Sequence, residues 1–309
     1  MRGRHMRLRG PRWTPDPATP SPALNPAVPT SVYSQCAMTI DVWMQHPTQR
    51  FLRSDMLDSL RRWTGGSIPD ADIPIEATIA SMDAGNVDIG LLSAWRGPNG
   101  QDLVSNDEVA EWIRLHPKRF AGLATVDLDR PMTAVRELRR RIADGFVGLR
   151  IVPWLWNAPP TDRRYYPLFA ECVESGVPFC TQVGHTGPLR PSETGRPIPY
   201  IDQVALDFPE LVIVCGHVGY PWTEEMVAVA RKHENVYIDT SAYTIKRLPD
   251  ELVRFMRTGT GQRKVLFGTN YPMIGHSHAL EGLDELGLSE DACRDFLHGN
   301  AVRVFRLTL

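Results

Sequence analysis

The chain has 309 residues, of which 42% are hydrophobic and 23% charged, and its formal net charge is -2. This is the composition of an ordinary globular protein, and the near-neutral charge gives no reason to expect nucleic acid or an anionic membrane as a partner. No apolar run approaches the roughly 20 residues that cross a bilayer, which excludes a membrane-embedded protein.

Residues 1–37 differ in composition from the rest of the chain. They are rich in Pro, Arg and Ser, carry Asp16 as their only acidic residue and show no apolar periodicity, which predicts a disordered extension. A transit peptide would also be basic and acid-poor, but the prolines oppose an amphipathic helix, and the apolar core of a secretory signal is missing. We favour an upstream start codon or a tag-like extension, with Met38 as the functional beginning and one domain over 38–309.

From Met38 onward, short apolar runs alternate with segments of helical periodicity. The eight predicted strands are Thr39–Trp43, Val87–Leu92, Phe120–Thr125, Phe146–Val152, Pro178–Val183, Leu211–Cys215, Val236–Asp239 and Val265–Phe267. The predicted helices are Ile75–Ala84, Asn106–His116, Met132–Ala143, Tyr166–Ser175, Tyr200–Phe208, Thr223–Lys232, Pro249–Thr258, His278–Leu286 and Ser289–Phe305.

Eight apolar strands that alternate with helices predict an α/β protein, a single-domain (β/α)8 TIM barrel. The main alternative is an open doubly-wound sheet. A nucleotide-binding sheet of that kind needs a Gly-rich phosphate turn, and neither GxGxxG nor GxxxxGK[ST] is present.

The five cysteines are scattered and never spaced as CxxC. They predict reduced thiols and a cytoplasmic location. Cys180 and Cys215 lie in apolar runs, which indicates small core residues rather than nucleophiles.

Strand ends are the informative positions, because in a barrel the working side chains lie where each strand stops. The polar residues at these ends are Gln45, Arg150, Gln182, His217, Asp239 and Asn270.

The motifs around these residues resemble the amidohydrolase-2 family (aminocarboxymuconate-semialdehyde decarboxylase-like) over nearly everything after Met38. The landmarks, in order, are Asp41-Val42, Gly216-His217-x-Gly219 with Pro221-Trp222, 235–241, 267–272 and Gly299-Asn300-Ala301 with Val304-Phe305. The resemblance implies a barrel enzyme whose first strand ends in His-x-His, the fifth in a His and the eighth in an Asp, which together hold a divalent metal.

This sequence departs from that pattern at each metal position. Trp43-Met44-Gln45 replaces His-x-His, Gln182 replaces the histidine, and Asn270 replaces the aspartate. An indole and neutral amides lack the charge and lone pairs that hold Zn²⁺, so we expect no metal and no other cofactor. His46 and His185 would restore a metal site if both turned inward. Because amides and the indole donate hydrogen bonds, the same pocket is suited to a carboxylate or a developing oxyanion.

His217 is the leading catalytic candidate, since it matches the family's strand-six histidine and transfers protons near neutral pH without a metal. A core histidine satisfied by backbone is the alternative. His185, on a Gly-rich loop, is a second catalytic candidate or a substrate wall. Asn270, with Gln45 and Gln182, is expected to orient the reacting group.

Arg150 is placed to bind a substrate carboxylate, although a buried structural ion pair explains it nearly as well. Trp43, Trp154 and Trp156 are expected to form an aromatic wall against a flat substrate, or simply to close the top of the barrel. Asp239 matches a family landmark, but it is also explained as a cap of the following turn.

The sequence therefore predicts a metal-independent hydrolase or decarboxylase that acts on a small carboxylated cyclic or aromatic molecule. The reaction stays open, because the resembled family contains decarboxylases and hydrolases, lactonases among them. The competing class is a catalytically silent barrel that binds a ligand or a partner. A homo-oligomer is compatible with the sequence.

Overall fold

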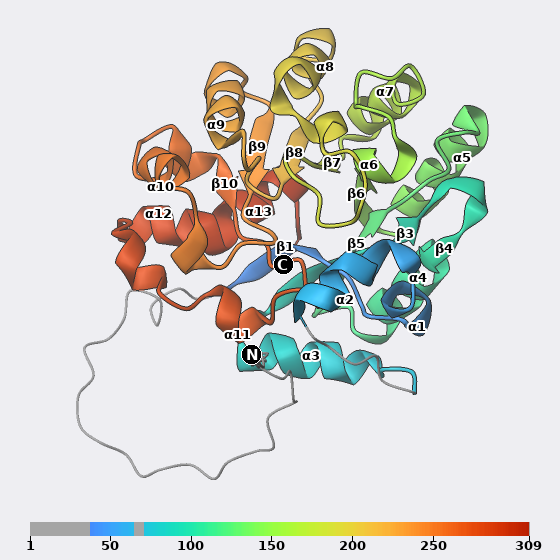
Figure 1. Ribbon diagram of the computed structural model, residues 1–309, viewed down its shortest axis with the longest axis horizontal. Coiled ribbons are helices and arrows are strands. Elements are labelled where there is room, and N and C mark those ends of the chain that lie inside the picture. Colours follow the sequence, from blue (N-terminus) through green and yellow to red (C-terminus); the bar gives the residue numbers. More distant parts are fainter. Residues whose placement is uncertain (1–37, 65–70, 309) are drawn as a thin grey trace, which may run out of the picture.

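The computed structural model describes residues 38–64 and 71–308, and within them it confirms the predicted barrel. Eight parallel strands form one sheet in the order β1-β2-β5-β6-β7-β8-β9-β10 (Figure 1). Their bounds are β1 (Ile40–Met44), β2 (Ile89–Ser93), β5 (Phe120–Ala124), β6 (Phe146–Ile151), β7 (Phe179–Gln182), β8 (Ile213–Gly216), β9 (Val236–Asp239) and β10 (Val265–Leu266). Each corresponds to one predicted strand. The predicted extension over 1–37 lies outside the described residues.

The segment after β10 closes the barrel against β1. The Val42 N–H donates to the Phe267 carbonyl at 3.0 Å, and the Asn270 N–H donates to the Trp43 carbonyl at 2.7 Å. Farther along, the Gln45 N–H reaches the Tyr271 carbonyl at 3.1 Å. This closure brings Gln45 and Asn270, two candidate residues from opposite ends of the barrel sequence, side by side.

Helices surround the barrel, as Figure 1 shows, and most lie where the apolar periodicity predicts them. The outer helices are α3 (Ile75–Ala84), α4 (Asn106–Leu115), α5 (Pro131–Ala143), α7 (Tyr166–Ser175), α8 (Asp202–Asp207), α9 (Thr223–Lys232) and α10 (Asp250–Met256). The Ser105 side chain caps α4 by accepting from the Glu108 N–H, while the Glu108 side chain accepts from the Ser105 N–H, so two backbone donors at the start of the helix are satisfied.

The prediction of a single helix over His278–Leu286 is wrong. This segment consists of α11 (His276–Ala279) and the 3₁₀ helix η8 (Leu283–Leu286), because Gly282 between them has φ 84°, in the left-handed region. The long helix predicted after Ser289 consists of α12 (Glu290–Arg294), the π-helical turn η9 (Asp295–Gly299) and α13 (Asn300–Phe305).

Several short elements were not predicted because each is too short for a periodic signal. They are α1 (Gln49–Leu52), η2 (Asp55–Leu57), α2 (Asp58–Thr64), the antiparallel pair β3 (Trp95–Arg96) and β4 (Asp102–Val104) with η3 (Pro98–Gly100) between them, α6 (Pro153–Trp156), η4 (Glu193–Gly195), η5 (Pro197–Ile201), η6 (Ile245–Arg247) and η7 (Gly261–Arg263).

The barrel interior is filled by side chains. Ile40, Leu91, Leu123, Cys180 and Val214 form one buried cluster with Val304 and Phe305 of α13. This helix therefore plugs one end of the barrel, as expected for a packed core rather than a pore. Cys180 and Cys215 are buried free thiols, which confirms their interpretation as core residues.

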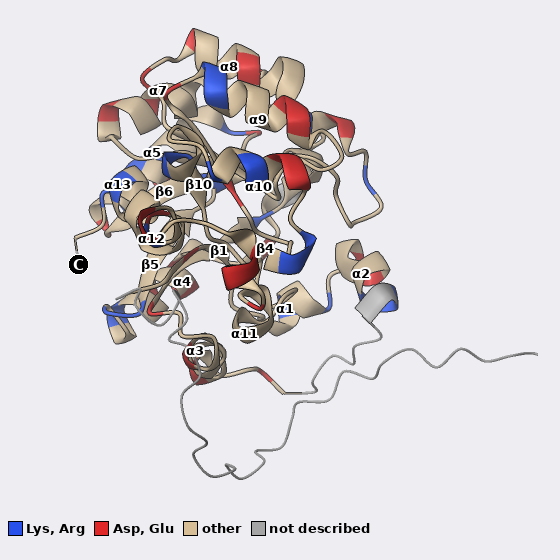
Figure 2. Cartoon of the chain, turned by 90° about the vertical axis from the view of Figure 1, so that its left-hand side faces the viewer, with Lys and Arg blue, Asp and Glu red and all other residues tan. Residues whose placement is uncertain are grey.

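Charged residues of both signs are interspersed on the outer helices (Figure 2). None of the helices in the described part of the chain is long and apolar enough to cross a membrane.

Candidate functional site

A pocket of about 400 Å³ lies at the ends of the strands opposite α13. Its apolar lining comes from Phe51, Leu57, Leu60, Trp95, Trp154, Gly187, Pro188, Ala242, Tyr243, Met273 and Ile274, and its polar lining from Gln182, His185, His217, Arg247 and Asn270. An apolar pocket of this size with a few convergent polar groups suits a small ligand of about one ring. Five of the eight residues predicted for the site line this pocket: His217, His185, Asn270, Gln182 and Trp154.

His217 is held in an unusual backbone conformation directly after β8. Its φ is 73° and that of Val218 is 53°, both in the left-handed region that non-glycine residues rarely adopt. Such strain is found at functional sites, where the surrounding structure has to fix it. The ring lies 5.2 Å from the Trp43 ring in an edge arrangement, and Nε2 lies 3.5 Å from the Asn270 amide nitrogen.

A chain of hydrogen bonds behind His217 determines which of its ring nitrogens carries the proton. Nδ1 lies 2.7 Å from the Ser241 hydroxyl oxygen, and Ser241 donates its backbone N–H to Asp239 Oδ1 at 2.9 Å. Burial raises the pKa of Asp239 to about 6, against the effect of Ser241, so this carboxyl is mostly ionised at pH 7. The Asn270 amide nitrogen beside Nε2 is a hydrogen-bond donor, so we assign the proton of His217 to Nδ1, beside the Ser241 hydroxyl, and the lone pair to Nε2.

His217 is neutral at physiological pH. Burial, and secondly the positive charge of Arg150, lowers its pKa to about 3. Its Nε2 is unprotonated and lines the pocket, which is the protonation state that a general base needs, but a pKa this far below neutrality makes it a weak base.

Acid should destabilise the fold through His217. The unfolded chain binds a proton at this residue below about pH 6.5 and the folded chain does not, so the stability loss begins near pH 6.5 and grows as the pH falls toward 3. At pH 5 the loss amounts to about 2 kcal/mol. Between pH 7 and pH 5, urea unfolding should therefore show the wild type losing about 2 kcal/mol more than His217→Asn. Equal losses would mean that His217 titrates normally in the folded protein.

The residues that the resemblance assigns to the metal positions, Trp43, Gln45, Gln182 and Asn270, are poor ligands for a divalent metal. Trp43 offers no lone pair, and the three amide oxygens already accept hydrogen bonds from other side chains of the chain. Gln45 Oε1 accepts from Trp95 Nε1 at 3.1 Å, Gln182 Oε1 from Trp154 Nε1 at 2.7 Å, and Asn270 Oδ1 from Gln45 Nε2 at 3.2 Å. Within residues 38–64 and 71–308, no group of three or more His, Cys, Asp or Glu side chains is arranged to hold a metal ion.

The two histidines considered as alternative ligands do not come together. His46 is buried outside the pocket, with Nδ1 2.8 Å from Thr78 Oγ1 and Nε2 2.9 Å from the Ile73 carbonyl oxygen. His185 is exposed at the pocket mouth, where its carbonyl accepts from Gln182 Nε2 at 3.2 Å. Both ring nitrogens of His46 thus have partners in α3 or just before it, at Thr78 and Ile73.

The predicted site residues Trp43, Gln45 and Arg150 do not line the pocket. They lie behind it, where they contact the lining residues His217, Asn270 and Trp95. The Arg150 guanidinium stacks between two indoles, 4.0 Å from the centroid of Trp43 and 4.8 Å from that of Trp95. Its Nη2 donates to Gln45 Oε1 at 3.1 Å. Burial lowers the pKa of Arg150 to about 9, so it still carries its charge at pH 7. Arg150 thus contacts Trp43, Trp95 and Gln45 and does not line the pocket.

Sequence reasoning missed residues that the loops supply. Arg247 ends η6 and Tyr243 follows β9 by four residues, and both line the pocket. Trp95 stands on β3, two residues after the end of β2 at Ser93, where the sequence analysis selected no candidate. The proximity of Ser241 to His217 was detectable only in part, through the landmark 235–241 that contains it.

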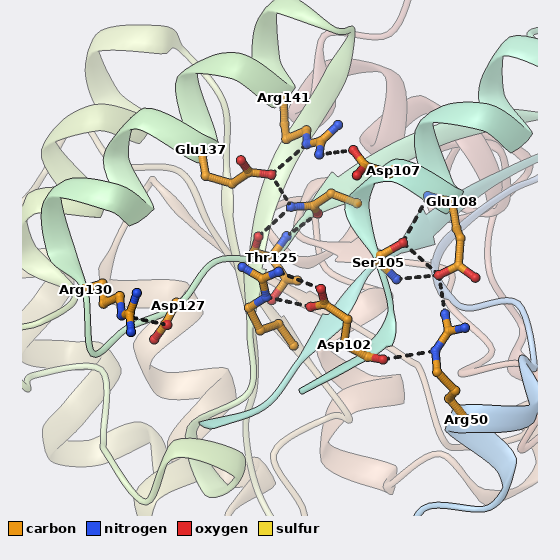
Figure 3. A network of polar contacts seen from close by, with 12 residues as sticks. Arg50, Asp102, Ser105, Asp107, Glu108, Thr125, Asp127, Arg130, Glu137 and Arg141 are labelled. Carbon is orange, nitrogen blue, oxygen red and sulfur yellow. Dashed lines mark hydrogen bonds and ion pairs between the residues drawn. The ribbon is translucent and has the colours of Figure 1, made fainter. Parts of the chain in front are cut away.

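A polar network anchors the hairpin that carries Trp95 (Figure 3). Arg96 forms two hydrogen bonds with Asp102 across the hairpin, both at 2.6 Å. Arg50 joins α1 to the hairpin through the Asp102 carbonyl, at 3.1 Å, and also pairs with Glu108 of α4. These ties to two helices fix one wall of the pocket.

The chain is similar to known proteins over most of its length. A model of the amidohydrolase-2 family, described as amidohydrolase, matches residues 41–307. The gamma-resorcylate decarboxylase of Rhodococcus jostii is 26% identical, the match covering 66% of this chain and 75% of that protein. An uncharacterized TIM-barrel protein from Bordetella bronchiseptica superimposes with a TM-score of 0.75 at 25% identity, covering 87% of this chain and 98% of the other.

A more distant structure shares the fold alone. The 5-carboxyvanillate decarboxylase of Novosphingobium aromaticivorans, complexed with manganese and a nitrobenzoic acid, has a TM-score of 0.66 at 18% identity, over 87% of this chain and 96% of that one. The family model spans nearly all of the described barrel, and the landmarks in the sequence agree with it. The chain therefore belongs to the amidohydrolase-2 family.

Proposed function

We propose that this protein is a metal-independent hydrolase or decarboxylase that acts on a small carboxylated cyclic or aromatic molecule. The observation that carries the proposal is His217, which is neutral, strained in its backbone and aligned by Ser241 and Asp239, with Nε2 toward the pocket. A proton-transfer group prepared in this way is costly for a fold to maintain without a use for it.

The charge of the lining indicates an anionic substrate. Its polar members are two histidines, two amides and Arg247, and none of the lining residues is an Asp or Glu. Arg247 is exposed at the rim, and within the described residues no carboxylate pairs with it. A guanidinium beside an apolar cavity is suited to bind a carboxylate with two parallel hydrogen bonds.

Two reactions are compatible with this arrangement. In hydrolysis, His217 Nε2 takes a proton from water as the water oxygen attacks the carbonyl carbon of a ring ester, and the amides of Asn270 and Gln182 orient the attacked group. The ring C–O bond then breaks, and His217 returns the proton to the departing oxygen. In decarboxylation, a proton replaces the carboxyl group on carbon as CO₂ leaves. The neutral state of His217 favours water activation, whereas the names of the gamma-resorcylate and 5-carboxyvanillate decarboxylases favour loss of CO₂.

A substrate screen tests the proposal. Purified protein, treated with a chelator, is incubated with hydroxybenzoates and with carboxylated lactones, and products are followed by absorbance and mass spectrometry. Turnover with release of CO₂ identifies a decarboxylase, and ring opening with addition of water identifies a hydrolase. Saturable binding of these compounds without any turnover would support the alternative, a catalytically silent ligand-binding barrel.

Arg247→Ala should weaken the binding of carboxylated ligands. A hydrogen bond to a charged group is worth about 1.5–3 kcal/mol, so Kd for a carboxylated ligand should rise about 10–100-fold, while Kd for its uncharged methyl ester should change little. Titration calorimetry measures both. Arg254→Ala removes an exposed arginine of α10 that does not line the pocket and serves as the control. An equal loss for acid and ester would exclude a charge-specific contact.

A further inference from the structure

Arg150 is a buried charge without a direct counter-ion. Its side chain is 2% exposed, and in the described part of the chain no carboxylate oxygen lies within 4.0 Å of its guanidinium. Within residues 38–64 and 71–308, only Nη2 makes a hydrogen bond, to Gln45, while Nε and Nη1 have no partner. A buried arginine normally pairs with an acid, because removing a charge from water costs far more than a single neutral hydrogen bond returns.

The position of this charge coincides with the family's metal positions. Arg150 stacks on Trp43, which replaces the first histidine of His-x-His, and hydrogen-bonds to Gln45, which replaces the second. Gln45 in turn donates to Asn270, which replaces the aspartate. Trp43 and Gln45 thus contact the guanidinium directly, and Asn270 is connected to it through Gln45.

The residues at the family's metal positions are suited to contact a guanidinium and are poor ligands for a metal. The indole faces of Trp43 and Trp95 attract a flat cation, and the Gln45 oxygen accepts from it. A histidine or aspartate set would instead direct lone pairs at a compact divalent ion.

We propose that the Arg150 guanidinium is a built-in cation that occupies the place of the family's metal and excludes a divalent ion from it. This inference rests on the metal independence proposed above. The guanidinium supplies positive charge near Asp239 and His217, which helps to keep the one ionised and the other neutral. It offers no coordination site, so any reacting water has to be activated by His217.

Restoring the family's ligands with and without Arg150 tests the exclusion. One variant carries Trp43→His, Gln45→His, Gln182→His and Asn270→Asp, and the second adds Arg150→Met. After circular dichroism has shown both to be folded, Mn²⁺ and Zn²⁺ binding is measured by equilibrium dialysis. The variant without Arg150 should bind one equivalent on the order of 100-fold more tightly, since a cation a few ångströms away opposes the ion. Equal affinity in the two would overturn the proposal.

A single substitution tests the cation site if the multiple variants do not fold. Arg150→Ala should bind free guanidinium ion at millimolar concentration, with a saturable change in tryptophan fluorescence and a higher melting temperature. Urea and sodium chloride should give neither effect, and Arg247→Ala should not respond to guanidinium. A folded Arg150→Ala without a saturable response would also overturn the proposal. Stoichiometric metal in the wild type would instead refute metal independence itself.

Discussion

Replacing His217 by Asn should lower kcat on the protein's substrate by about 10²–10⁴-fold and leave the barrel folded. His217 is the described histidine whose Nε2 lies next to Asn270 in the pocket while its Nδ1 is bound by Ser241. An Asn side chain keeps a polar contact to Ser241 but cannot take up a proton near neutral pH, so the proton transfer is lost and the packing is largely kept.

Steady-state kinetics on the substrate found in the screen measures this effect. His278→Asn, which changes an exposed histidine of α11, is the matched control and should retain wild-type kcat. Ser241→Ala should shift the pH profile of kcat/KM, because the hydroxyl fixes the tautomer of His217. Wild-type turnover by His217→Asn would show that the assignment is wrong and would transfer the role to His185 or to the substrate itself.

Replacing Asp41 by Ala should destabilise the barrel by about 3–5 kcal/mol. The Asp41 carboxylate is completely buried at the closure of the barrel. Oδ1 accepts from the Trp43 N–H at 2.9 Å and the Thr269 N–H at 3.1 Å, and Oδ2 accepts from the Thr269 hydroxyl and lies 3.3 Å from His276 Nε2. Alanine leaves the two backbone N–H groups and the Thr269 hydroxyl buried without this acceptor.

Urea unfolding of the variant, followed by circular dichroism, measures this loss. Asp41→Asn should cost less, because its amide oxygen still accepts from the two backbone N–H groups. Glu210→Ala removes an exposed carboxyl and should change the free energy of unfolding by no more than about 0.5 kcal/mol. A loss below about 1 kcal/mol for Asp41→Ala would mean that the closure does not depend on this carboxylate.

The barrel was predictable from the sequence because its strands are apolar on both faces and its helices are strongly periodic. Helices α3, α7 and α9 begin and end at the predicted residues. Residues that interrupt a helix mark some of these ends, since Pro74 precedes α3 and Gly85 and Gly176 follow α3 and α7. The hairpin of β3 and β4 was not predictable, because strands of two and three residues have no periodicity to detect. The division of 278–286 depends on the backbone angle of one glycine, which a hydrophobic pattern does not encode.

Site residues at strand ends could be predicted from the sequence. Residues contributed by loops, and the direction in which a side chain points, could not. The strand-end rule identified Gln182, His217 and Asn270, which line the pocket. It also selected Arg150, whose guanidinium turns between two indoles instead of into the cavity, an outcome that depends on Trp95 of the unpredicted hairpin. Arg247 comes from the turn after β9, and no local signal distinguishes it from an ordinary surface arginine.

Elemental analysis of the purified protein, combined with turnover in the presence of a chelator, tests the central claim most directly. Because Trp43, Gln45, Gln182 and Asn270 stand at the family's ligand positions and Arg150 lies among them, the protein should carry well under one equivalent of any divalent metal. Its turnover should be the same before and after exhaustive treatment with chelator. One equivalent of zinc or manganese, with activity that disappears on chelation and returns with the metal, would contradict the account.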